Sequence, residues 1–301
     1  MQLQHILDNV FYVPGPSNIG VVVGKDRQAL LVDTGIGTRS GRRLLQILED
    51  QGLQLAAIFN THCHGDHIGG NAYLVEHTGA TVYAPPYDAV VLERPIWGTM
   101  CMFGGADPIS ELSSPRFSAQ ACKVDQIVTE GEMCVAGVAV QAISLPGHTG
   151  SHTGYIVGGV FFTGDALAGE EELVNARLSY AYSVTRRLQS LEKLRQYPCA
   201  YHVLGHGRIQ RDIASLIDRN IAQVLDVLDF IKRYLTQGCA DIGAIFGAVC
   251  EHYEIEIRTI GQYFLLYPTL HACLSHLNNC GEISFRIRGN QLLWCPTDGR
   301  S

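Results

Sequence analysis

Short apolar runs that end in glycine or Pro-Gly dominate the first sixty residues. Three such segments, NVFYVPG, NIGVVVG and ALLVDTG, carry β-branched or aromatic runs before a turn, which is the pattern of consecutive short strands. Over residues 40–51, Leu44 and Leu48 share one face while charged residues occupy the other, which predicts a helix. The apolar segment LQLAAIFNT that follows predicts a buried strand. We therefore expect a sheet that begins early and a helical crossover into a buried strand.

The same alternation returns after residue 80. The segments GATVYAPP, VAVQAISLPGH and GYIVGGVFFTGDAL are typical of strands, and SVTRRLQSLEKLRQY predicts a helix that leads into the strand AYHVLGHG. Alternating strands and helices predict an α/β domain. Residues 85–130 include a stretch without clean periodicity that is rich in Met, aromatic and Gly residues. Long irregular insertions in compact domains are usually lids or binding loops, so a substrate loop is predicted here.

The pattern changes after Gly207. Apolar residues recur every three or four positions from Arg211 to Thr236, which predicts one strongly amphipathic helix. Helical patterns follow over residues 241–250 and 259–277, and EISFRI, RGN and QLLWC then predict the strand, turn and strand of a β-hairpin. Helices followed by a hairpin suggest a helical, winged-helix-like module over residues 209–301, appended to a main domain over residues 1–208.

Composition and charge narrow the possible partners. The 301 residues carry a net charge of −7, which argues against general attraction to nucleic acid or to an anionic membrane surface and favours a small-molecule substrate. The N-terminus has no basic stretch followed by an apolar one, and no segment approaches the roughly 18 apolar residues of a spanning helix. We therefore expect a cytoplasmic protein without membrane contact. The ten cysteines form no CxxC pair, and most are expected to be reduced and buried.

Residues 61–70, THCHGDHIGG, place three histidines and an aspartate within six positions, directly after a predicted strand. Neutral imidazoles and a carboxylate are the ligands that a divalent ion such as zinc prefers. On an extended chain His62 and His64 point the same way and can share one ion, whereas Asp66 and His67 are displaced and can serve a second. A lone histidine would more often be a surface residue. Four potential ligands in six residues favour a metal site.

Three further candidate ligands follow strands of the second cycle. His148 in LPGHTG, Asp165 in FFTGDAL and His206 in VLGHGR each lie beside a glycine, which lets the backbone and a ligand approach closely. An aspartate between two ions can bridge them, and Asp165 is the candidate for that position. His206 would complete the ligands of the second ion. Each residue alone is weak evidence, and the shared position after a strand supports the assignment.

The combination of HxHxDH, PGHT, TGD and GHG over roughly residues 8–208 resembles the metallo-β-lactamase superfamily. The resemblance implies a catalytic domain built as a four-layer αββα sandwich, with the site at one edge. It implies two ions with these ligands: His62, His64 and His148 for the first, Asp66, His67 and His206 for the second, and Asp165 shared. It also implies that Asp33 in LLVDTG lies behind the site and orients a histidine ligand.

Other histidines and the insertion complete the set of candidate residues. Seven histidines have no ligand counterpart in the family pattern and are expected to be structural or surface residues: His5, His77, His152, His202, His252, His271 and His276. A second group, Trp97, Met100, Met102 and Phe103, either lines an apolar substrate pocket or represents ordinary packing of the insertion.

Within this superfamily the sequence is most similar to the glyoxalase II branch. An aspartate stands at position 165, where one class of β-lactamases has a cysteine. Hydroxyacylglutathione hydrolases and related thioesterases and lactonases use metal-bound hydroxide to attack an activated acyl carbon. The resemblance therefore implies a binuclear, zinc-dependent hydrolase of a small-molecule thioester or lactone, with Asp66 and Asp165 as its catalytic carboxylates. After residue 208, no counterpart to the glutathione-binding helices of glyoxalase II is found.

Two alternative functions use the same residues. Persulfide dioxygenases of the superfamily resemble the THCH segment and bind one iron ion, here through His62, His148 and Asp165. A metal-dependent RNA or phosphodiester hydrolase with a nucleic-acid-binding tail is the other alternative. Four arginines over residues 239–301 are outnumbered by six acidic residues, which disfavours nucleic acid. We expect instead that the C-terminal module packs over the active site or forms a homodimer contact.

Overall fold

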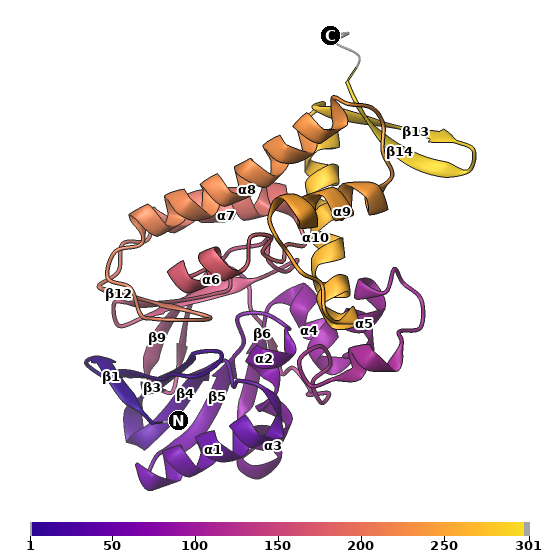
Figure 1. Ribbon diagram of the computed structural model, residues 1–301. Helices are drawn as coiled ribbons and strands as arrows, with labels where there is room; N and C mark the ends of the chain where they lie inside the picture. The colour runs from indigo at the N-terminus through magenta and orange to yellow at the C-terminus, as the bar shows by residue number, and fades with distance from the viewer. Residues whose placement is uncertain (1, 298–301) are drawn as a thin grey trace.

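The computed structural model describes residues 2–297, and two β-sheets form its centre (Figure 1). The first sheet carries seven strands that lie side by side in chain order. Strands β1 to β4 pair antiparallel, and β4 to β7 pair parallel. Their bounds are Gln4–Leu7, Val10–Val13, Ile19–Val23, Gln28–Val32, Gln54–Phe59, Thr81–Ala84 and Gln126–Ile127. The early strands and the buried strand predicted over residues 53–61 are confirmed.

The second sheet has five strands in the order β12-β11-β10-β9-β8. Only β11 and β12 pair in parallel, because helix α7 connects them. The strand bounds from β8 to β12 are Gly131–Val135, Val138–Ser144, Thr153–Val157, Val160–Gly164 and Tyr201–Leu204. The strands predicted in VAVQAISLPGH and AYHVLGHG are confirmed as β9 and β12, and GATVYAPP is β6 of the first sheet. The segment GYIVGGVFFTGDAL, predicted as one strand, forms the two antiparallel strands β10 and β11, and β8 was not predicted.

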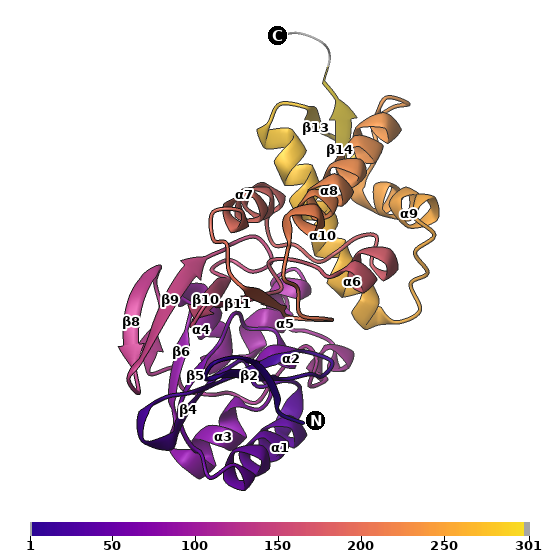
Figure 2. The ribbon, with the colours of Figure 1, turned by 90° about the vertical axis from the view of Figure 1, so that its left-hand side faces the viewer.

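The two sheets face each other across one apolar core, and helices cover both outer faces (Figure 2). Phe59 from the first sheet and Phe162 from the second lie in this shared core. Helices α1 (Gly37–Asp50) and α3 (Asn71–Thr78) cover the first sheet through a second cluster that contains Leu44 and Leu74. Helix α7 (Val184–Leu194) and the first half of α8 (Ala214–Leu235) cover the other sheet. The predicted αββα sandwich is therefore confirmed.

The chain continues into a C-terminal helical region. The second half of α8 packs with α9 (Ile242–His252) and α10 (Ile260–Asn279), and the hairpin of β13 (Ile283–Arg288) and β14 (Gln291–Pro296) follows. The helices and hairpin agree with the periodicity, and Thr259 begins α10 with a capping box that includes Gln262. The winged-helix-like arrangement and the division between residues 208 and 209 stay predictions.

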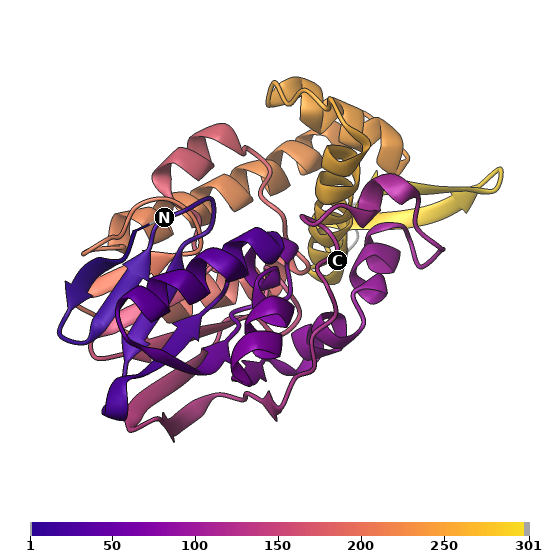
Figure 3. The ribbon, with the colours of Figure 1, turned by 90° about the horizontal axis from the view of Figure 1, so that it is seen from below.

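The insertion over residues 85–130 is more regular than predicted. It contains α4 (Pro86–Glu93), α5 (Ile96–Met102) and the 3-10 turn η2 (Ser110–Ser113) before β7. Periodicity missed both helices because each is only about two turns long and carries apolar residues on several faces. Phe103 packs against Phe264 of α10 with ring centroids 5.1 Å apart, and Figure 3 shows α5 beside that helix.

Cysteine usage partly contradicts the expectation. Eight cysteines are free, which agrees with the expectation that most are reduced, but among these only Cys122 and Cys273 are buried, so the prediction that most are buried is wrong. Cys239 and Cys295 form a disulfide because their neighbours Ala240 and Trp294 pair as an antiparallel bridge and bring the two thiols together. Among residues 2–297, no helix combines the length with the apolarity that a membrane crossing requires.

Candidate metal centre

The first four candidate ligands lie in one loop and one short helix at the carboxyl end of β5. His62 is fully buried, and its Nε2 lies 3.1 Å from Nδ1 of His64. Asp66 and His67 lie in helix α2 (Gly65–Ile68), whose turn carries them away from the two preceding histidines. The loop between strand and helix thus separates the four side chains into two pairs, as the spacing predicted.

Three other segments bring the remaining candidates to the same place. His148 follows β9, Asp165 follows β11 and His206 follows β12. Nε2 of His148 lies 2.9 Å from Nδ1 of His64, and Nε2 of His206 lies 3.4 Å from Nε2 of His67. The potential ligand atoms form two groups, each within 4.8 Å: His62, His64, His148 and Asp165 in one, and Asp66, His67 and His206 in the other.

The Asp165 carboxylate lies between these two groups. Its Oδ2 is 3.4 Å from Nε2 of His148 and 3.4 Å from Nε2 of His206, while its Oδ1 is 3.4 Å from Nε2 of His67. Although Oδ1 is buried, it accepts no hydrogen bond from residues 2–297. A buried carboxylate oxygen without a donor is costly unless a cation is its partner. The position agrees with the predicted bridge.

The chemistry of both groups fits divalent metal ions. Burial lowers the pKa of His62, His64 and His148, so these imidazoles are neutral and offer lone pairs. Burial also acts to lower the pKa of His206, but the Asp165 carboxylate outweighs it and raises that pKa to about 9. A metal ion bound at the second group would displace the proton that this raised pKa places on His206. The two clusters are consistent with a binuclear metal site.

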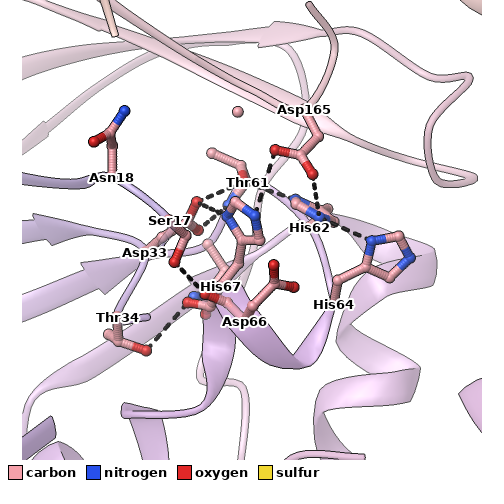
Figure 4. A network of polar contacts seen from close by, with 12 residues as sticks. Ser17, Asn18, Asp33, Thr34, Thr61, His62, His64, Asp66, His67 and Asp165 are labelled. Carbon is pink, nitrogen blue, oxygen red and sulfur yellow. Dashed lines mark hydrogen bonds and ion pairs between the residues drawn. The ribbon is translucent and has the colours of Figure 1, made fainter. Parts of the chain in front are cut away.

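Buried polar groups behind the ligands fix their orientation (Figure 4). Oδ2 of Asp33 accepts hydrogen bonds from Nδ1 of His67, at 2.9 Å, and from the Thr61 hydroxyl, at 2.7 Å. The proton on Nδ1 leaves Nε2 of His67 free to bind a metal ion. The Pro16 carbonyl accepts a hydrogen bond from Nδ1 of His206 in the same way. Asp33 therefore lies where the resemblance implied.

His152 is a contributor that the sequence did not reveal. Its Nε2 accepts a hydrogen bond from the backbone N–H of Asp165 at 3.1 Å, and its ring stacks on His62 with centroids 5.1 Å apart. Burial lowers the pKa of His152 to about 3, so the ring stays neutral and can accept this bond. His152 therefore holds the backbone of Asp165 and packs against the ring of His62. This role is more specific than the structural or surface role that was expected.

Asp88, at the start of the insertion, is a second residue that was missed. Its carboxylate accepts hydrogen bonds from the backbone N–H of Cys63, at 2.9 Å, and from the Ser151 hydroxyl, at 2.6 Å. One buried carboxylate thus ties the loop of His62 and His64 to the loop of His148. No periodicity or motif marks such a role, because both partners are distant in the sequence.

We expect His152→Ala to lower the affinity of the first ion by about 10- to 100-fold, the usual effect of removing a partner that orients ligands. Loss of the ring frees the Asp165 backbone and leaves a void beside His62. Titration of metal-free protein against a chromophoric chelator measures the change. His77→Ala, which removes an exposed histidine bonded to the Tyr73 carbonyl, serves as the control. Unchanged affinity in His152→Ala would contradict the assigned role.

The other candidates lie outside the two ligand groups. His202 is buried, and neither of its ring nitrogens has a hydrogen-bond partner among residues 2–297. Trp97 is about half exposed on α5, while Met100, Met102 and Phe103 are half-buried. The remaining expected surface or structural histidines are His5, His77, His252, His271 and His276, none of which belongs to either group.

Comparisons with known proteins agree with this geometry. Residues 12–206 match the family described as the Metallo-beta-lactamase superfamily. An atrochrysone carboxyl ACP thioesterase from Aspergillus fumigatus is 26% identical over 290 residues, which are 91% of this chain and 59% of that protein. A hydroxyacylglutathione hydrolase from Methylobacillus flagellatus is 31% identical over 192 residues, 62% of this chain and 60% of that protein. The chain thus spans about three fifths of the length of each of these relatives.

Solved structures share the fold over nearly the whole chain. A beta-lactamase domain protein from Burkholderia ambifaria superposes with a TM-score of 0.79 at 18% identity, covering 98% of this chain and 94% of that one. A metallo-beta-lactamase family protein from Thermus thermophilus gives a TM-score of 0.74 at 21% identity, covering 95% of this chain and 97% of that one. The αββα fold, the two His/Asp clusters and the family match over residues 12–206 agree. The chain belongs to the metallo-β-lactamase superfamily.

Proposed function

We propose that the protein is a binuclear, zinc-dependent thioesterase of the glyoxalase II-like branch, acting on a small acyl thioester. The observation that carries the proposal is the position of Asp165 between two ligand groups, which provides for two ions a few ångströms apart. Of the relatives named above, one is an ACP thioesterase by name and the other a hydroxyacylglutathione hydrolase, which supports hydrolysis of an acyl thioester. A lactone, with a similarly activated acyl carbon, is the related substrate class.

The chain's own residues supply binding, orientation and proton transfer. When bound, a pair of divalent ions supplies Lewis acidity and lowers the pKa of water enough to make it a nucleophile near neutral pH. Asp165 holds the two halves of the site together, and His152 and Asp33 fix the ligands. The side chains of Asp66 and His206 are 24% and 29% exposed, so the site opens to solvent on their side. We assign Asp66 as the carboxylate that takes up the proton of the attacking water, and Asp165 as the carboxylate that lies between the two ligand groups.

The ligand arrangement favours hydrolysis over the iron-dependent alternative. A persulfide dioxygenase needs only two histidines and one aspartate, which His62, His148 and Asp165 could provide. Here His64 belongs to the same group, and the second group of Asp66, His67 and His206 would have no purpose. We further propose a cytoplasmic protein with a small-molecule substrate, without nucleic-acid or membrane partners, in which the C-terminal region serves the active site or a homodimer.

Metal analysis and a substrate panel test the proposal. We expect about two zinc ions per chain in protein purified without added metal, and thiol release from at least one acyl thioester with kcat/KM of about 10⁴ M⁻¹s⁻¹ or higher. The panel contains acyl-CoA, acyl carrier protein and glutathione thioesters, together with lactones, a phosphodiester and glutathione persulfide. About one iron ion and no zinc, or turnover of the phosphodiester or persulfide alone, would overturn the assignment.

A further inference from the structure

We propose that the C-terminal helices help to position the first ligand group, that of His62, His64, His148 and Asp165. In this proposal Thr269 of α10 is a positioning residue for His148. The link is the loop of residues 176–183, between α6 (Glu170–Asn175) and α7. The C-terminal region binds this loop on one side, and the loop binds the His148 segment on the other. The inference rests on the metal-binding part of the proposed function and goes beyond it, because it assigns the C-terminal region a role in metal binding.

The C-terminal helices hold the loop at three places. The Gln223 side chain of α8 donates hydrogen bonds to the carbonyls of Leu173 and Ala176, at 3.0 and 3.2 Å. Leu178 is buried in the same apolar cluster as Val227 of α8 and Leu270 of α10.

The third contact is the backbone N–H of Ala181, which donates to the Thr269 hydroxyl at 3.1 Å. Thr269 and Ala181 are both only 2% exposed, so bulk solvent does not compete for this bond. The loop therefore takes its position from helices more than forty residues later in the chain.

On its other side the loop holds the segment that carries His148. The N–H of Tyr182 donates to the carbonyl of His148 at 3.2 Å, and the N–H of Ser183 donates to the carbonyl of Gly147 at 3.1 Å. Ala181 and Tyr182 are adjacent, so one peptide unit separates the bond to Thr269 from the bond to His148. A displacement of this unit displaces the backbone of a candidate ligand.

The same loop places Tyr180 against the imidazoles. The Tyr180 ring meets His64 edge-on at 5.1 Å and His148 edge-on at 5.4 Å, measured between ring centroids. Its carbonyl accepts a hydrogen bond from Nη1 of Arg187 at 2.9 Å. Arg187 is 5% exposed, and its backbone lies so close to Gly147 that a side chain at position 147 would overlap it. The loop and the His148 segment therefore cannot move independently of α7.

A small cavity behind the loop of residues 176–183 makes the hydrogen bond to Thr269 more important for the position of the loop. The cavity holds about 20 Å³ and is lined by Leu178, Arg187 and Thr269 among others, and Nε of Arg187 is buried without a hydrogen-bond partner among residues 2–297. That volume is enough for about one water molecule. Packing behind the loop is thus incomplete, so the bond from Ala181 to Thr269 carries more of the positioning than it would in a close-packed core.

Metal affinity without substrate tests this role. We expect Thr269→Val, which keeps the side-chain shape and removes the hydroxyl, to weaken cobalt(II) binding at the first site by about tenfold, the lower end of the range for residues that orient ligands. Thr269→Ser keeps the hydroxyl and should restore the affinity. Both are measured by competition with a chromophoric chelator in a His206→Ala background, where only the group around His148 retains all its ligands. The visible absorption of bound cobalt reports any change in ligand geometry.

A matched control separates positioning from loss of stability. Thr259→Ala removes the cap of the same helix, far along α10 from the loop, and should lower the melting temperature without changing cobalt affinity. Wild-type affinity and spectrum in Thr269→Val, or equal weakening in Thr259→Ala, would overturn the proposal. The cobalt measurement involves no substrate, so it can support the role of Thr269 even if no thioester of the panel is hydrolysed. Likewise, hydrolysis of a thioester would not by itself support the role of Thr269.

Discussion

Asp165→Ala is expected to reduce kcat/KM for thioester hydrolysis by at least about 10³-fold while the chain stays folded. Among residues 2–297, Asp165 is the carboxylate that faces both ligand groups, within 3.4 Å of nitrogens from His67, His148 and His206. Its loss would remove a candidate ligand that faces both groups, together with one of the negative charges that would offset bound divalent cations. We expect metal content to fall from two ions to one or fewer, as measured by elemental analysis beside steady-state kinetics.

The fold should survive this substitution because the core does not depend on the metal site. Hydrophobic side chains pack between the two sheets and under the outer helices, and a chain of this size buries enough surface to fold without staples. Circular dichroism and a cooperative thermal transition check this point. Asp50→Ala, at the exposed end of α1, is the control and should keep full activity. Retained turnover in folded Asp165→Ala would refute the assignment of this residue.

Elements with strong periodicity could be predicted from the sequence, and short elements could not. The 22 residues of α8 form several turns with one apolar face, so the pattern is averaged over many positions. Helix α5 has seven residues, with Gly98 among them, and its position depends on packing against α10 rather than on local preference. Similarly, the exposed strand β8 follows an insertion and pairs only with β9, which no local pattern specifies.

The residues of the site also fall into a predictable and an unpredictable set. Metal ligands are predictable because their chemistry requires particular side chains, and here those side chains are concentrated at strand ends. His152, Asp88 and Thr269 act instead through backbone N–H groups of segments 13 to 88 residues away. Residue type carries no information about such contacts, since any side chain with a suitable acceptor could make them. Only the folded chain shows which acceptors meet which donors.

Gly205→Ala should lower kcat/KM by at least about 100-fold although all seven candidate ligands remain, because small displacements of catalytic groups have effects of that size. Gly205 lies directly after β12, where its N–H donates to the Gly164 carbonyl at 2.9 Å and its carbonyl accepts from the N–H of Asn18 at 2.7 Å. A β-carbon at this position would overlap Oδ1 of Asp165 and would approach Cε1 of His67 to 3.0 Å. The two hydrogen bonds prevent the backbone from moving away, so Asp165 must move instead.

The same substitution at Gly247 distinguishes this effect from a general cost of adding a methyl group. Gly247 lies within α9, and a β-carbon there meets no atom within 4 Å, so Gly247→Ala should leave activity unchanged and stabilise the helix by about 0.5–1 kcal/mol. Kinetics and metal content of both variants, with circular dichroism to verify folding, make the comparison. Full activity in Gly205→Ala would show that Asp165 can be displaced without consequence, and its position between the two ligand groups could then no longer support the two-ion proposal.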